Sequence, residues 1–294
     1  MKTYNNVEVV IPLYNGEKYI PLILEEFADQ RTDFSCKLHF VLTNTGDKSE
    51  EILKQSGVTY DVIEKKDFSH SLTRENAVLH SKADAVIFLT QDCRLVNSDV
   101  YQKLVMCLSE EVKFAYLRQV NSNKTVEKYS RRINYPNHSI IKDKTSIEKM
   151  GINAFFASDA CSVVDVEYFK SIHGYDGLNL PTSEDMYYAY KVIQSGKKVM
   201  YCADSFVDHT HKFTLHQLYQ RYYLVGEFFA LCPQFKKYHA NNSGLRLASK
   251  IALMAIKEFN IGVLFAFVPN MLARYLGKKN GEREGRKSKQ KAIV

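Results

Sequence analysis

The sequence predicts an α/β protein built on a mostly parallel sheet with helices on both faces. Short apolar runs alternate with segments of helical apolar spacing through the first 120 residues. Strands that are apolar throughout are typical of a sheet covered on both sides. The chain has 294 residues, of which 45% are hydrophobic, so it can bury a full core and is not a disordered chain.

The first half follows a regular strand–helix order. The run 7–12 is β-branched, 18–30 has helical apolar spacing, and 38–42 is a second apolar strand. The same alternation then repeats, which favours parallel strands joined by helical crossovers. The expected strands are 7–12, 38–42, 60–63, 85–89 and 114–120, and the expected helices are 18–30, 49–55, 73–81 and 98–108.

The second half has a different pattern and is expected to be mixed. The charged stretch 121–150 has little periodicity, so we expect a mobile connection or lid there. Strands are expected at 153–164 and 199–203, a helix at 184–194, and a long aromatic helix at 214–231.

Basic residues are concentrated at the C-terminus. Lys and Arg number 40 against 33 Asp and Glu, and residues 277–294 carry five of the seven net positive charges. Residues 245–276 mix apolar and basic side chains, which suits amphipathic helices on an anionic membrane, or a helical cap on the domain. The uncharged stretch 259–273 is too short to span a bilayer. The tail lacks interleaved aromatic residues, which argues against nucleic-acid binding.

The cysteines predict neither a zinc site nor a disulfide framework. None of the six forms a C-x-x-C pair. The first residues lack the apolar stretch of a signal peptide. We therefore expect a cytoplasmic protein, with peripheral contact to the inner face of the plasma membrane.

Asp92 is the first candidate site residue. It follows the apolar strand 85–89 after Thr90 and Gln91, and ligands of parallel sheets bind beyond the carboxyl ends of the strands. A carboxylate there can hold a divalent cation against a diphosphate. The same position also suits an ordinary turn or cap acid.

Three other groups lie at the ends of expected elements. Glu184 and Asp185 begin a helix, where the dipole keeps a carboxylate ionised as a proton acceptor, or where acids only stabilise the helix. His209 and His211 alternate near a strand end as metal ligands, phosphate donors or surface residues. Arg74 begins a helix and would face a phosphate at the same sheet edge or lie in solvent.

Four motifs in this order resemble the inverting family 2 glycosyltransferases, which have a GT-A fold. The match covers residues 7–230. The motif from His70 to Arg74, with Thr90-Gln91-Asp92 and the His-x-His segment, is most similar to the bacterial rhamnosyltransferase branch, which uses dTDP-L-rhamnose to build cell-wall, capsular or O-antigen polysaccharide. The four motifs are Val9-Val10-Ile11-Pro12-Leu13-Tyr14-Asn15-Gly16-Glu17, Thr73-Arg74 with Leu89-Thr90-Gln91-Asp92, Ser183-Glu184-Asp185, and Val207-x-His209-x-His211.

The resemblance implies a role for each of these residues. Asp185, with Glu184 beside it, matches the base that deprotonates the acceptor hydroxyl. Asp92, His209 and His211 match positions that contact Mg²⁺ or Mn²⁺ or the diphosphate, and Gln91 stands where many members have an acid. The nucleotide-sugar contacts are expected to be Pro12, Tyr14, Asn15, Glu17, Thr43, Asp47, Arg74 and Gln91.

The chain departs from the family pattern at several positions. Thr43 stands near the place of the family's base-reading Asp, and Asp47 lies a little beyond it. Ser71 and Leu72 replace two glycines of the rhamnosyltransferase pattern, and Glu75 stands where Asn is usual.

The resemblance, with the change of pattern and of composition along the chain, predicts a division of the chain. Residues 1–120 would be the nucleotide-binding half and 121–230 the acceptor-binding half of one GT-A domain, followed by an amphipathic helical segment at 231–276 and a basic, disordered tail at 277–294. We expect transfer of L-rhamnose, with inversion, from a nucleotide sugar to a polysaccharide or lipid-linked saccharide. The alternatives are a UDP-hexose donor, a nucleotide-diphosphate hydrolase and a non-catalytic nucleotide-binding protein.

Overall fold

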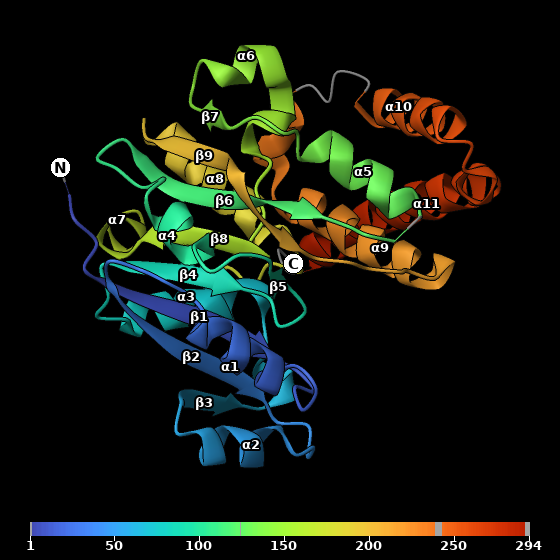
Figure 1. The fold of residues 1–294 in the computed structure, drawn as a ribbon. Helices are drawn as coiled ribbons and strands as arrows, with labels where there is room; N and C mark the ends of the chain where they lie inside the picture. The colour runs from blue at the N-terminus through green and yellow to red at the C-terminus, as the bar shows by residue number, and fades with distance from the viewer. Residues whose placement is uncertain (1, 124, 239–242, 292–294) are drawn as a thin grey trace.

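A computed structural model describes residues 2–123, 125–238 and 243–291, and a nine-stranded mixed sheet runs through it (Figure 1). The strand order is β3-β2-β1-β4-β8-β6-β9-β5, and β7 pairs with β9. The strands are β1 (Asn6–Leu13), β2 (Ser35–Thr43), β3 (Thr59–Ile63), β4 (Ala85–Leu89), β5 (Arg94–Leu95), β6 (Val112–Val120), β7 (Ile140–Lys142), β8 (Cys161–Asp165) and β9 (Lys198–Asp208).

Helices cover the sheet and extend beyond one end of it (Figure 1). They are α1 (Ile20–Ala28), α2 (Ser49–Ser56), α3 (His70–His80), α4 (Val100–Val105), α5 (Val126–Asn134), α6 (Ser146–Met150), α7 (Val166–Ser171), α8 (Glu184–Gln194), α9 (Leu215–Leu231), α10 (Ser243–Lys257) and α11 (Ile261–Lys291), with short 3₁₀ turns at η1 (Lys65–Asp67), η2 (Gly151–Phe155) and η3 (Pro233–Lys237).

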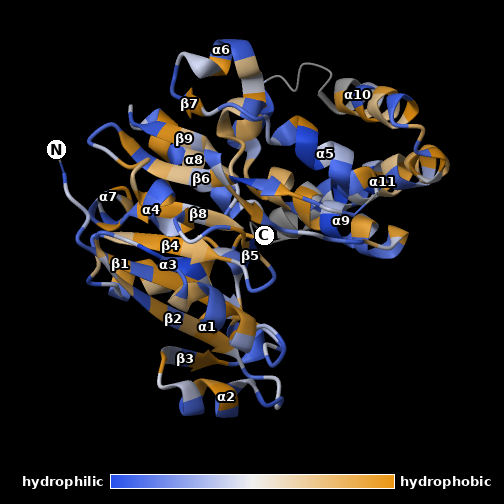
Figure 2. Ribbon diagram, in the orientation of Figure 1, coloured by the Kyte–Doolittle hydropathy of each residue, from blue (hydrophilic) through white to orange (hydrophobic). Residues whose placement is uncertain are grey.

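The predicted parallel, doubly covered sheet is confirmed in the first half. Strands β3, β2, β1 and β4 are parallel neighbours, and every residue of β4 is buried. Val9 and Ile87 lie in the core on one face, and Val10 and Phe88 lie in the core on the other. Because both faces of the sheet are buried, the strands contain continuous apolar runs, and they are mostly orange in Figure 2.

The second half is mixed, as expected, and it brings more strand ends to the same edge. β8 is antiparallel to both β4 and β6, and β6 is parallel to β9. The carboxyl ends of β1, β2, β4, β6 and β9 therefore lie at one edge of the sheet. The turn that enters β8 lies there too, because Cys161 pairs with Leu89.

Two expectations for this half are wrong. Residues 121–150 contain α5, β7 and α6. The sequence did not indicate α5, because this helix is highly polar and buries only one narrow stripe, which includes Val126 and Tyr129. The strand expected at 153–164 is a 3₁₀ turn followed by β8. β9 is also longer than 199–203, and it runs through a register shift opposite Leu117 and Arg118 to end at Asp208.

The expected disordered tail is wrong for residues 277–291, which continue α11. Glycines bring α11 against the backbone of α9: a Cβ at Gly277 would overlap the carbonyl oxygen of Tyr219, and one at Gly281 that of Tyr223. Because this stretch is highly charged, its composition suggested disorder. It is helical because close backbone packing against α9 stabilises it. Residues 292–294 of the expected tail lie outside the described residues.

None of the helices formed by the described residues has the length and apolar character needed to cross a lipid bilayer.

Candidate functional site

Asp92, His209 and His211 converge at the sheet edge, as the sequence predicted. His209 Nε2 lies 3.4 Å from Asp92 Oδ1, and His211 Nε2 lies 3.6 Å from Asp92 Oδ2. Ligand atoms of the three side chains all lie within 4.8 Å of one another. Asp92 follows β4, and the histidines follow β9, whose length carries His209 to the end of β6, where its N–H donates to the carbonyl of Val120.

The protonation states of this triad suit a divalent cation. Burial, with the charge of His209, lowers the pKa of His211 to about 4, and burial also lowers the pKa of His209. Burial alone would raise the pKa of Asp92, but contact with His209 lowers it to about 2. A carboxylate is a ligand for Mn²⁺ and Mg²⁺, and neutral imidazoles are ligands for transition metals, so the three side chains fit a divalent cation such as Mn²⁺.

Gln119 fixes the orientation of His209, and sequence reasoning missed it. Its Oε1 accepts from His209 Nδ1 at 2.8 Å and also from Arg131 Nη1, while its Nε2 donates to Ser158 Oγ at 2.6 Å. Because the arginine always donates, the amide oxygen must face it. His209 then carries its proton on Nδ1, which leaves the Nε2 lone pair directed at the triad.

The loop after β1 is tied to the triad by Gln91. The backbone N–H of Tyr14 donates to Gln91 Oε1 at 2.8 Å, and Gln91 Nε2 donates to the carbonyl of Tyr14 at 3.0 Å. The Tyr14 ring is exposed, with Lys65 Nζ 5.7 Å from its centre. Asn15 has a φ of 51°, a conformation that asparagine tolerates. Pro12 is partly exposed at the end of the strand.

Other expected nucleotide contacts hold two loops together. The N–H of Lys48 donates to Glu17, and Asp47 accepts from the Ser49 hydroxyl at 2.7 Å. Thr43 is buried at the end of β2, and its hydroxyl has no hydrogen-bond partner among the described residues. Glu17 and Asp47 therefore make hydrogen bonds that stabilise these loops. The Thr43 side chain is buried and does not face solvent.

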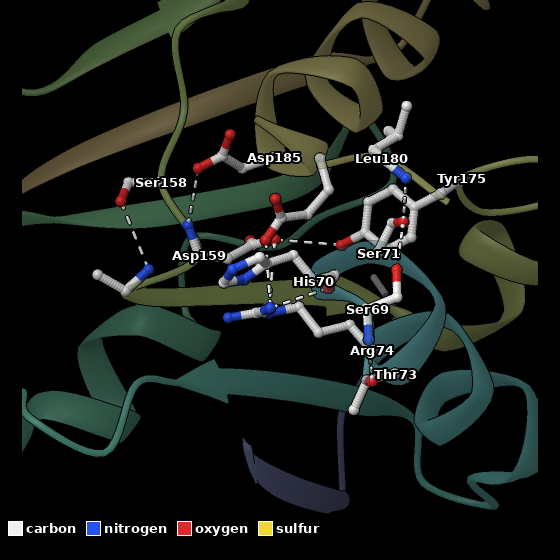
Figure 3. A network of polar contacts seen from close by, with 12 residues as sticks. Ser69, His70, Ser71, Thr73, Arg74, Ser158, Asp159, Tyr175, Leu180 and Asp185 are labelled. Carbon is white, nitrogen blue, oxygen red and sulfur yellow. Dashed lines mark hydrogen bonds and ion pairs between the residues drawn. The ribbon is translucent and has the colours of Figure 1, made fainter. Parts of the chain in front are cut away.

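Asp185 lies at the start of α8, partly exposed, and is held by a turn that enters β8. Its Oδ2 accepts from the N–H of Asp159 at 3.3 Å (Figure 3). Its Oδ1 accepts from the N–H of Met186 at 2.6 Å. Burial of the carboxyl, with the charges of Glu184 and Asp159 beside it, raises the pKa of Asp185 well above its usual range. Such a carboxylate is poised to accept a proton.

Glu184 and Arg74 form an internal ion pair beneath Asp185. Arg74 is buried, with Nη1 3.2 Å from Glu184 Oε1 and 2.9 Å from the carbonyl of His70 (Figure 3). Its Nε lies 4.0 Å from the buried carboxylate of Asp159. The expected phosphate contact of Arg74 is therefore replaced by contacts within the protein, and Glu184 is placed to position Asp185.

One short turn joins the two groups of residues. Ser158 accepts from Gln119, which contacts His209, and the next residue, Asp159, donates its N–H to Asp185. The turn is anchored at Phe156, whose carbonyl accepts from Tyr116 OH at 3.0 Å and from the buried Lys142. The triad and Asp185 are thus held relative to one another by a few well-packed residues.

Two arginines add positive charge beside the triad, and sequence reasoning missed both. Arg131 Nη2 lies 3.4 Å from His209 Nδ1, in the stretch read as a loop. Arg221 is exposed on α9, its guanidinium over the ring of Phe213, and among the described residues it makes no ion pair. Both charges oppose protonation of His209 and His211. In the sequence, Arg221 follows His211 by ten residues, and this short separation was the one indication that Arg221 lies near the triad.

Comparison with known proteins agrees with this arrangement. Residues 8–172 match the family described as "Glycosyl transferase family 2". The chain belongs to this family. It is therefore a glycosyltransferase, as the resemblance had implied, and the matched range includes most of β1, all of β4 and the turn before β8.

Two curated proteins are similar to this glycosyltransferase over nearly its whole length. The O-antigen chain rhamnosyltransferase RfbN of Salmonella typhimurium is 31% identical over 94% of this chain and 89% of its own. The O-antigen chain rhamnosyltransferase WbaN of Salmonella anatum is 26% identical over 93% of this chain and 88% of its own.

The fold of this glycosyltransferase is that of a GT-A enzyme. A mannosyltransferase from Pyrobaculum calidifontis, solved in complex with GDP-mannose and Mn²⁺, superposes with a TM-score of 0.63 over 97% of this chain and 87% of that one. The two sequences are only 12% identical, so the likeness concerns the fold.

Proposed function

We propose that this glycosyltransferase moves L-rhamnose from dTDP-L-rhamnose to a saccharide acceptor of a cell-surface polysaccharide, with inversion at the anomeric carbon. The similarity to two O-antigen chain rhamnosyltransferases supports the sugar and the acceptor class. The observation that carries the mechanism is the joining of Asp185 to the Asp92–His209–His211 triad through the turn at Ser158 and Asp159.

Asp185 is the proposed general base. It removes the proton from the acceptor hydroxyl while that oxygen forms a bond to the anomeric carbon and the bond from this carbon to the diphosphate breaks. Its raised pKa makes it a better proton acceptor than an ordinary aspartate. The N–H groups of Asp159 and Met186 orient the carboxylate, and Arg74 and Glu184 fix the start of the helix that carries it.

Asp92, His209 and His211 are the proposed metal ligands. A bound Mn²⁺ or Mg²⁺ would neutralise charge on the diphosphate as it leaves. Gln119 keeps the His209 proton on Nδ1, and the neutral state of both imidazoles keeps their lone pairs available near pH 7.

Arg221 is the proposed contact to the diphosphate itself. It is exposed beside the triad, and no carboxylate among the described residues pairs with it. A guanidinium can donate to two phosphate oxygens at once. On the nucleotide side, the exposed ring of Tyr14 suits stacking on the base, and Gln91 holds the loop that carries it.

A lipid-linked acceptor and peripheral contact with the inner face of the plasma membrane complete the proposal. The basic, helical C-terminal region supports such contact.

The test is a transfer assay with dTDP-L-rhamnose, UDP-glucose, UDP-galactose and UDP-N-acetylglucosamine, with Mg²⁺, Mn²⁺ or chelator. We expect a preference for dTDP-L-rhamnose and loss of transfer on chelation. Asp185→Asn keeps the shape but removes the base, so kcat should fall by about a hundredfold or more while donor binding persists. Near-normal transfer by Asp185→Asn would refute the base, and release of free rhamnose without an acceptor would indicate a hydrolase instead.

A further inference from the structure

The exposed side of α11 carries a continuous apolar face. Its members alternate in spacing by four and three residues, which places them on one side of the helix, and Phe259 extends the row at the turn from α10. Phe259 is 89% exposed, Phe265 81% and Val268 67%. We call this the docking face; it consists of Phe259, Ile261, Phe265, Val268, Leu272 and Tyr275.

No charge interrupts the docking face. Between residues 259 and 276 the one charged residue of the sequence is Arg274. Its side chain is buried on the opposite side of α11, where it contacts Glu127 of α5 and Tyr222 of α9. An exposed apolar surface of this extent marks an interaction site.

The surroundings of the docking face favour a lipid surface over a second copy of the chain. The alternating spacing would suit a coiled-coil seam, but such seams are flanked by charged residues. Here the exposed neighbours on the same stretch are Gly262, Ala266, Pro269 and Leu276. Cations lie instead at its two ends, at Lys257 and in the basic stretch that begins at Lys278.

We propose that the docking face inserts into the headgroup region of an anionic phospholipid bilayer, with α11 lying along the surface. Apolar side chains would enter the acyl boundary while the flanking Lys and Arg residues meet the lipid phosphates. This inference rests on the proposed function: a lipid-linked saccharide acceptor would lie in the same membrane surface, so docking would bring the enzyme to its acceptor.

The docking face is joined to the catalytic site by two helices. At the turn beside Phe259, Glu258 accepts from Tyr129 OH at 3.0 Å and from Lys128 Nζ at 3.2 Å, both on α5. Arg131, on the same helix, contacts Gln119 and so the metal-binding triad.

The second connection is α9, which begins four residues after His211 and packs against α11 through glycines. A Cβ at Gly226 of α9 would overlap the carbonyl oxygen of Lys278, and a Cβ at Gly281 that of Tyr223. Backbones this close cannot slide without repacking. Docking would therefore hold the catalytic site at a fixed height above the bilayer.

The test is flotation of the full chain with vesicles of phosphatidylcholine plus phosphatidylglycerol, and with vesicles of phosphatidylcholine alone. We expect binding to the anionic vesicles, and about tenfold or more weaker binding by Phe265→Asp, because an aromatic side chain that the bilayer would bury is replaced by an anion. Met106→Asp is the matched control: Met106 is 72% exposed at the end of α4, so this variant should bind like the parent.

Three outcomes would overturn the inference: a parent chain that does not float, equal flotation of Phe265→Asp and the parent, or a dimer in sedimentation that Phe265→Asp dissociates. The last would assign the face to a second copy of the chain. Transfer to a soluble acceptor without vesicles should be unchanged in Phe265→Asp. Flotation without any transfer by the parent would count against the proposed function and leave the docking face standing.

Discussion

Replacing Gln119 with Leu tests whether the orientation of His209 matters for metal binding. The change removes the acceptor shared by His209 Nδ1 and Arg131 and the donor to Ser158, while nearly keeping the side-chain volume. His209 is buried, so its Nδ1–H would lose its partner, and Arg131 would remain 3.4 Å from the ring with no oxygen between them.

The expected magnitude follows from these contacts. A buried polar group left unpaired costs about 1–3 kcal/mol, and loss of a partner behind a metal ligand weakens metal binding about ten- to a hundredfold. That range corresponds to about 1.4–2.8 kcal/mol of binding free energy. We expect Gln119→Leu to weaken Mn²⁺ binding by this amount, measured by calorimetric titration or by electron paramagnetic resonance of free Mn²⁺.

Two further variants make the result interpretable. Gln119→Glu restores an acceptor for both donors and should bind Mn²⁺ more tightly than Gln119→Leu. Gln102→Leu removes two hydrogen bonds to Asp33 at the surface, away from the triad, and should bind like the parent. Mn²⁺ affinity of folded Gln119→Leu within twofold of the parent's would show that His209 needs no such support.

Three other perturbations have defined outcomes. Glu184→Gln removes a negative charge that raises the pKa of Asp185, so this pKa should fall and the acid limb of the kcat/KM profile should move to lower pH. Gly281→Ala forces a Cβ into the backbone of α9 and should lower stability by about 1–3 kcal/mol, seen as a lower Tm. Arg221→Met should weaken binding of the nucleotide diphosphate by about ten- to a hundredfold, because a charge-assisted hydrogen bond contributes about 1.5–3 kcal/mol.

Two of these perturbations have a control in the same chain, and the third has a result that would contradict it. Gly262→Ala adds the same methyl group where the nearest atom is 3.8 Å away, so its Tm should not fall. Mn²⁺ binding should be unchanged in Arg221→Met, since this arginine is not a proposed ligand. An acid limb that stays in place in Glu184→Gln would mean that another group governs it.

The sequence by itself determined the strands and helices of the first half of the chain and the positions of two acids. Asp92 follows a continuous apolar strand, and Asp185 begins a helix with clear spacing, so local periodicity was sufficient to place both. The His209–His211 pair was recognisable as a possible ligand set because alternating residues near a strand end point to one side. These features depend on neighbours within a few residues along the chain.

Arg74 shows why other roles could not be read locally. Its position at a helix start suggested a phosphate contact, but it pairs with Glu184, 110 residues further along the chain. The partner of His209 is Gln119, from another strand, and that of Asp185 is the N–H of Asp159. No local pattern marks such partners, because the sheet order that assembles them is set by packing of the whole core.

The C-terminal region divides in the same way. The sequence alone showed an uncharged stretch at residues 259–273 and a basic stretch at residues 277–294. Tertiary structure decided that residues 277–291 are helical, because Gly277 and Gly281 allow backbone contact with α9, and that Phe265 faces outward while Arg274 faces inward. Which side of a helix is buried depends on the surface against which it packs, and that surface comes from distant parts of the chain.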